Sequence, residues 1–73
     1  MPKLPVVSGK ECRKTLERLG FREARQRGSH LVMRRDESGC TVPMHAEIKN
    51  GTLSGILKQA GVSVEEFISA LGR

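Results

Sequence analysis

Two short segments, residues 30–35 and 40–45, place apolar side chains at alternating positions, and this pattern constrains the fold most. Side chains of a β-strand alternate between the two faces of its sheet, so the pattern predicts two strands that share one apolar face. That face carries Leu31, Met33, Cys40, Val42 and Met44, and the other carries His30, Val32, Arg34, Thr41, Pro43 and His45. Only the first face can pack against a core.

The two strands are joined by residues 36–39, whose composition, Asp-Glu-Ser-Gly, is typical of a turn. Pro43 has no N–H to donate to a ladder, so the later strand is expected at the edge of the sheet. If Asp36 and Gly39 flank the turn symmetrically, the cross-strand pairs include Arg34 with Thr41 and His30 with His45. The two histidines of the chain are then predicted to be neighbours.

Residues 21–27 could form a weak helix or a strand, because Ala, Glu, Arg and Gln favour helix. Seven residues between two glycines are few for a helix, and the next strand needs a partner, so we interpret the segment as a strand. A tight turn at Arg27-Gly28 would place Ala24 opposite Leu31 on the apolar face. It would place Arg25 beside His30 on the other face.

Three helices are predicted around these strands. Ser8 and Ser63 are each followed three residues later by glutamate, which is a capping box. The middle helix begins near Asn50 after a polar connector, residues 46–50. The predicted apolar stripes are Cys12, Leu16 and Leu19; Leu53, Ile56, Leu57 and Ala60; and Val64, Phe67, Ile68 and Leu71. This order predicts one α+β domain over residues 1–73, with a three-stranded antiparallel sheet and all helices on one face.

The charge favours an anionic partner. Thirteen Lys and Arg against eight Asp and Glu give a net charge of +5 on 73 residues, which suits a polyanion or an acidic protein. The chain has no Trp or Tyr, and both Phe21 and Phe67 are needed for the core. Bases therefore have no aromatic platform to stack on, and binding of a nucleic acid would depend on charge and backbone shape.

Cysteine usage and apolar runs indicate the compartment. No apolar signal segment precedes Cys12 or Cys40, and the longest apolar run has three residues, which predicts a cytoplasmic chain with reduced thiols and no membrane span. The spacings of Cys12, Cys40, His30 and His45 match no zinc pattern. We therefore expect neither a metal nor another cofactor.

His30 is the candidate catalytic residue, because a histidine takes and gives protons near neutral pH. Among arginines it suits a phosphodiester substrate, and RNA carries its own nucleophile in the 2′-hydroxyl. His45 is the candidate second proton-transfer group on register grounds alone. The candidate phosphate contacts are Arg25, Arg27, Ser29 and Arg34. The alternatives are that both histidines are surface residues without a task and that Arg34-Arg35 only solubilises the hairpin.

Several motifs in this order resemble the HicA family of toxin ribonucleases from bacterial toxin–antitoxin modules. They are Gly20-Phe21, Gly28-Ser29-His30, Thr41-Val42-Pro43-Met44-His45, Gly51-Thr52-Leu53 and Ile56-Leu57-Lys58-Gln59-Ala60-Gly61. One departure is Leu31, where many relatives carry a second histidine or a bulky residue. That departure concerns substrate preference.

The resemblance implies a double-stranded-RNA-binding-like domain that cleaves mRNA without a metal, using the histidine of the Gly-Ser-His motif, here His30. It also implies a cognate HicB-type antitoxin that covers the active site. Two rival functions are a non-catalytic RNA-binding module of the same fold and a protein-interaction domain that docks an acidic partner. Cleavage of RNA would separate both from a nuclease.

Overall fold

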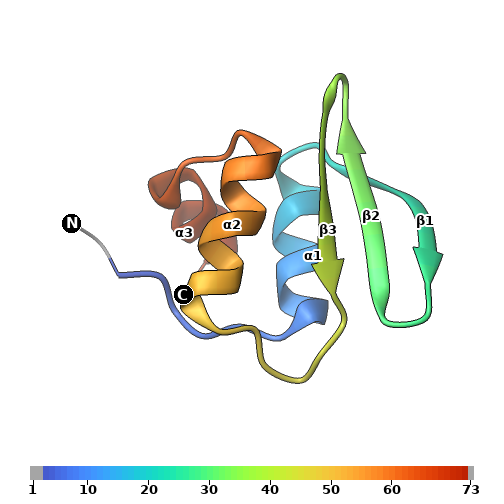
Figure 1. The fold of residues 1–73 in the computed structure, drawn as a ribbon. Helices are drawn as coiled ribbons and strands as arrows, with labels where there is room; N and C mark the ends of the chain where they lie inside the picture. The colour runs from blue at the N-terminus through green and yellow to red at the C-terminus, as the bar shows by residue number, and fades with distance from the viewer. Residues whose placement is uncertain (1–2, 73) are drawn as a thin grey trace.

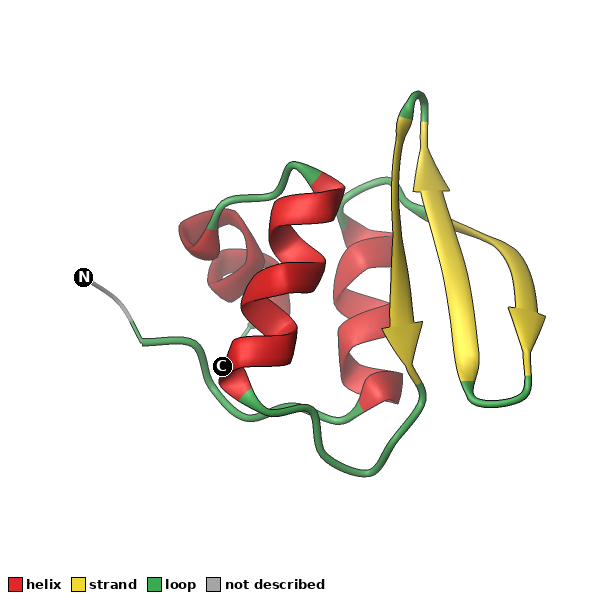
Figure 2. Ribbon diagram, in the orientation of Figure 1, coloured by secondary structure: helices red, strands yellow, loops and turns green. Residues whose placement is uncertain are grey.

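The computed structural model describes residues 3–72. Its elements, in chain order, are α1 (Gly9–Arg18), β1 (Arg22–Arg27), β2 (His30–Arg35), β3 (Ser38–Pro43), α2 (Asn50–Ala60) and α3 (Val64–Leu71) (Figure 1). The strands form one antiparallel sheet in the order β1-β2-β3, and the helices lie on one side of it (Figure 2). The predicted α+β fold is confirmed. None of the helices within residues 3–72 has the length and apolarity of a membrane span.

Both predicted capping boxes are present. The Ser8 hydroxyl accepts the Glu11 N–H and the Glu11 carboxylate accepts the Ser8 N–H, each over 3.0 Å. Ser63 and Glu66 repeat this pair of bonds at the start of α3. Each box satisfies two backbone donors that a helix N-terminus leaves unpaired, so both helices begin where the sequence predicts. At the other end of α2, Gly61 adopts the left-handed conformation, with φ of 71°.

The core lies between the helices and the apolar face of the sheet. On that face Leu31, Met33, Cys40 and Val42 are buried, as the alternation predicts. α2 packs mainly on β3, and α1 packs mainly on α3. The helices contribute Cys12, Leu16, Leu53, Ile56, Leu57, Ala60, Phe67 and Leu71 to the same core.

The sequence pattern predicts a polar connector before α2, and this prediction is wrong for one residue. Ile48 is only 2% exposed and belongs to the core. Its N–H donates to the carbonyl oxygen of Val7 over 2.7 Å, in an isolated antiparallel bridge. This bridge joins the segment before α1 to the loop before α2. The loop that follows β3 is therefore held at the end of β3 and again at Ile48.

The β2–β3 turn is shorter than predicted. Asp36 and Glu37 alone form it, Arg35 pairs with Ser38, and Asp36 has φ of 53°. The pairing therefore shifts by two residues, and both predicted pairs are wrong: His30 pairs with Pro43 and Arg34 pairs with Gly39. A shift of two positions leaves the residues of β2 and β3 on their predicted faces, because the side-chain period of a strand is two residues.

The predicted pairing of β1 is also wrong. Gln26, not Ala24, pairs with Leu31, and Arg27, not Arg25, pairs with His30. Ala24 has no partner because the register shifts there, so it is the extra residue of a β-bulge. All six residues of β1 are exposed, and β1 is the strand farthest from the helices (Figure 2).

Arg35 is a structural residue rather than a solubilising one. Its Nη1 donates to the carbonyl oxygen of Leu19 over 2.7 Å, at the C-terminal end of α1. Its guanidinium carbon lies 4.5 Å from the centre of the Phe21 ring, which is a cation–π distance. Arg35 thereby fastens the end of β2 to the segment that joins α1 to β1.

Candidate active site

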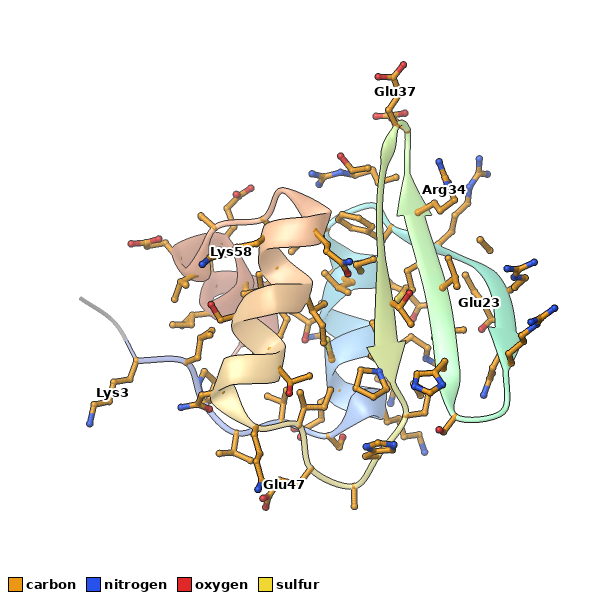
Figure 3. The ribbon with its side chains drawn as sticks, viewed as in Figure 1. Lys3, Glu23, Arg34, Glu37, Glu47 and Lys58 are labelled. Atoms are coloured by element: carbon orange, nitrogen blue, oxygen red, sulfur yellow. The ribbon has the colours of Figure 1, made fainter. Side chains whose placement is uncertain are left out.

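The uncovered face of the sheet is strongly basic. Cross-strand partners project to the same face, so the observed pairing defines what we call the open face: Arg22, Arg25, Arg27, His30, Val32, Arg34, Gly39, Thr41 and Pro43. Four of these residues are arginines and none is acidic. Arg34 is visible on β2 in Figure 3. A surface of this composition attracts a polyanion.

Arg22 joins the open face because of the bulge. In a regular strand Arg22 and Arg25, three residues apart, would project to opposite faces. The extra residue, Ala24, restores the parity, so that Arg22 pairs with Arg34 and Arg25 pairs with Val32. Alternation alone missed Arg22 as a site residue, and no motif in the sequence signals this bulge.

His30 is the first residue of β2 and is exposed. The two-residue turn before it contains Gly28, whose φ of 54° suits glycine, and the Gln26 side-chain amide donates to the Gly28 carbonyl oxygen over 3.0 Å. Arg27 pairs with His30 on one side, and Pro43 pairs with it on the other. The turn therefore delivers the imidazole to the open face between a cation and an apolar ring.

A pocket of about 440 Å³ opens beside His30. It is lined by His30, Pro43, His45, Glu47, Ile48, Lys49 and Thr52. The two histidines thus share one pocket, although they are not the cross-strand pair that the sequence predicts. Glu47, on the loop between β3 and α2 (Figure 3), together with Lys49 and Thr52, was missed by the sequence pattern. These residues come from the connector and the first turn of α2, whose packing brings them to the sheet.

Backbone hydrogen bonds hold the segment that carries His45. The Met44 N–H donates to the Ser29 carbonyl oxygen over 2.6 Å, which continues the ladder one residue past β3. The Gly9 N–H donates to the His45 carbonyl oxygen over 2.8 Å. Ser29, a candidate phosphate contact, thus lies in the turn beside this segment. The loop on the His45 side of the pocket is fastened to both the sheet and α1.

The arrangement suits proton transfer next to a phosphodiester. Two imidazoles line one pocket, and guanidinium groups stand on the adjoining face of the sheet. Imidazoles move protons, and fixed guanidinium donors stabilise charge that develops on phosphate oxygens. Within residues 3–72, no three His, Cys, Asp or Glu side chains gather closely enough to hold a metal ion.

The sequence profile of one known family, described as the HicA toxin of bacterial toxin–antitoxin, matches residues 9–62. The chain belongs to the HicA toxin family. The matched region begins with α1 and includes the whole sheet, His30 and every residue that lines the pocket. A search of curated proteins finds no match. As a HicA toxin, the chain acts within a toxin–antitoxin system and has an antitoxin partner.

Among the candidate residues of this HicA chain, the structure brings two groups together. His30 and His45 line the pocket. Arg25, Arg27 and Arg34 lie on the open face with His30. Arg27 is the arginine directly opposite His30, in the position that the sequence assigned to Arg25. The Gly-Ser-His turn, one of the motifs that carry the resemblance, lies where the open face meets the pocket.

Proposed function

We propose that this HicA toxin is a metal-independent endoribonuclease that cleaves mRNA in the cytoplasm and is neutralised by a HicB-type antitoxin. One observation carries the proposal. His30 is exposed on a basic face without acidic residues, and it lines the same pocket as His45. This placement combines attraction for a polyanion with two proton-transfer groups.

The proposed reaction uses the 2′-hydroxyl of RNA as the nucleophile. One imidazole takes the 2′-hydroxyl proton while the 2′-oxygen bonds to phosphorus, and the other imidazole gives a proton to the departing 5′-oxygen. The P–O5′ bond breaks, leaving a 2′,3′-cyclic phosphate and a 5′-hydroxyl. His30 and His45 fill these two roles, and their shared pocket is the support for assigning the second role to His45.

The arginines bind the phosphates. In this proposal Arg27 contacts the scissile phosphate or the next one, which its pairing with His30 supports, and Arg25 and Arg34 extend the basic surface away from it. Guanidinium groups keep their charge at every relevant pH, so they stabilise the charged phosphorane whichever imidazole is protonated. Ser29 adds a hydroxyl at the turn before His30.

Cleavage of RNA by the purified chain in the presence of EDTA tests the enzyme. We expect wild type to generate 2′,3′-cyclic phosphate ends, and we expect His30→Ala to lose at least about 100-fold in rate, as for removal of a general acid or base. Lys58→Ala is the control, because Lys58 lies on the side of α2 that faces away from the sheet (Figure 3). If wild type binds RNA but leaves it intact, the non-catalytic RNA-binding module replaces the nuclease.

The antitoxin is tested in cells. We expect expression of the chain to arrest bacterial growth, His30→Ala to abolish the arrest, and a HicB-type protein encoded next to it to restore growth. An antitoxin that covers the open face should present acidic groups to its arginines. Growth arrest by His30→Ala equal to wild type would instead favour the protein-interaction domain.

A further inference from the structure

Strand β1 carries three arginines that the fold does not need. Arg22, Arg25 and Arg27 all lie on the open face, and every residue of β1 is exposed. In the described part of the chain, none of their guanidinium groups makes a hydrogen bond or an ion pair, whereas the Arg35 guanidinium donates to the backbone carbonyl oxygen of Leu19. Their charges repel one another on a strand that contributes little to the core. Binding an anion would offset this repulsion.

The three arginines are evenly spaced. Arg27, Arg25 and Arg22 stand opposite His30, Val32 and Arg34, which are successive same-face positions of β2. Such positions are about 6.7 Å apart along a strand. An extended RNA strand repeats its phosphates at a comparable interval. The bulge at Ala24 is what preserves this even spacing, because without it Arg22 would project to the other face.

We propose that β1 binds the backbone of single-stranded RNA, with Arg27, Arg25 and Arg22 on three successive phosphates that lead away from His30. This inference rests on the proposed ribonuclease function, and it adds Arg22 and the path of the substrate. The three charges of β1 form one row along an exposed edge strand, with Arg34 of β2 beside Arg22 at its far end, and one such row follows one backbone. Attack by the 2′-oxygen in line with the leaving 5′-oxygen also needs a flexible nucleotide, which a regular A-form duplex does not supply.

The path predicts how binding depends on salt. Each phosphate contact to a single strand adds about 0.7 to the slope of log affinity against log salt, because counterions are released. Affinity falls by a certain factor between 50 and 200 mM salt, and the loss of one contact makes this factor about 2.6-fold smaller. Wild-type protein can be measured with a 2′-O-methyl RNA strand, which has no free nucleophile and stays intact.

The decisive comparison is between two variants with the same change in charge. We expect Arg22→Ala to lower the slope by about 0.7, as do Arg25→Ala and Arg27→Ala, and Arg22→Lys to restore most of it. Lys58→Ala, which removes a cation from α2 on the helix side of the molecule (Figure 3), should leave the slope unchanged. Equal slopes for Arg22→Ala and Lys58→Ala would overturn the proposed path.

A duplex of the same length tests the substrate class. We expect Arg22→Ala to change the slope for the single strand and not for the duplex, and an equal change for both would overturn single-strand selectivity. Binding to the uncleavable strand does not depend on catalysis. If the slopes depend on the arginines but the protein cuts no RNA, the nuclease proposal is wrong and the proposed path stands. If the protein cuts RNA but the slopes do not depend on the arginines, only the proposed path is wrong.

Discussion

Gly9 donates its backbone N–H to the carbonyl oxygen of His45 over 2.8 Å, so the first residue of α1 is bonded to the segment that carries the second histidine of the pocket. The two backbones approach so closely that a β-carbon on residue 9 would lie 2.5 Å from the carbonyl oxygen of Pro43 and 2.6 Å from the α-carbon of Met44. Only glycine fits there. The position of His45 therefore depends on where α1 begins.

We predict that Gly9→Ala destabilises the protein by about 1–3 kcal/mol, as overpacking of a tight contact does. Alanine is the better helix former, so the clash must outweigh a gain of about 0.5–1 kcal/mol. Because the displaced segment carries His45, cleavage of RNA should also fall in the protein that remains folded. Urea denaturation and single-turnover cleavage measure the two effects.

Gly55→Ala is the matched control within α2. A β-carbon at this exposed position has no atom within 4 Å. We expect it to stabilise the protein by about 0.5–1 kcal/mol without changing cleavage. If both variants destabilise the protein, the loss of stability at residue 9 cannot be attributed to its close contact with Pro43 and Met44.

Substitution of the two adjacent arginines of β2 should affect different properties, stability for Arg35 and RNA binding for Arg34. Arg35→Ala removes the hydrogen bond to Leu19 and the contact with the Phe21 ring, and we expect a loss of about 1–3 kcal/mol in unfolding free energy. Arg34→Ala, on the open face, should change stability by less than about 0.5 kcal/mol and weaken RNA binding. Thermal unfolding and RNA-binding titrations of both variants check this, and an Arg35→Ala protein of normal stability would contradict it.

The two thiols should be protected and should make the fold sensitive to alkali. Burial, with a smaller contribution from Cys40, raises the pKa of Cys12 from 9.0 to about 12, and burial raises that of Cys40 to about 11. Unfolded thiols ionise near pH 9 while folded ones stay protonated, so we predict that stability is retained below pH 9 and falls as the pH rises from there.

Thiol labelling gives an independent measurement. At pH 8 the raised pKa values leave about 100-fold less thiolate at Cys40 in the folded protein than in the unfolded chain, and less still at Cys12. We expect labelling to be at least that much slower in the folded state and fast in urea. Fast labelling of the native protein at either residue would mean that its surroundings open readily.

The capping box of α3 should make stability depend on pH at the acid end. Hydrogen bonds from the Ser63 backbone and side chain lower the pKa of Glu66 below its ordinary value of 4.5. A lowered folded-state pKa gives stability that is present above the unfolded value and is lost as the pH falls through the folded value. We predict that Glu66→Gln flattens the loss of stability below pH 4.5. An acid unfolding curve identical to wild type would contradict this.

The sequence alone determined which side of the sheet each residue occupies on β2 and β3. The pleat alternates with a period of two residues regardless of partners, so His30 was predicted on the face opposite Leu31 even though the predicted register was wrong. The starts of α1 and α3 could also be predicted from the sequence, because the capping bonds at Ser8 and Ser63 join residues only three apart. The basic character of the open face followed from the same parity.

The tertiary structure decided everything that depends on which residues meet. A two-residue turn with Asp36 at positive φ set the register, and the bulge at Ala24 brought Arg22 to the open face. Backbone hydrogen bonds from Ile48 to Val7 and from Gly9 to His45 hold the connector beside the sheet, where His45 lines the same pocket as His30. Alternation is a property of one strand and can be predicted locally. Register, bulges and pockets depend on contacts between segments distant in the chain, which no local pattern encodes.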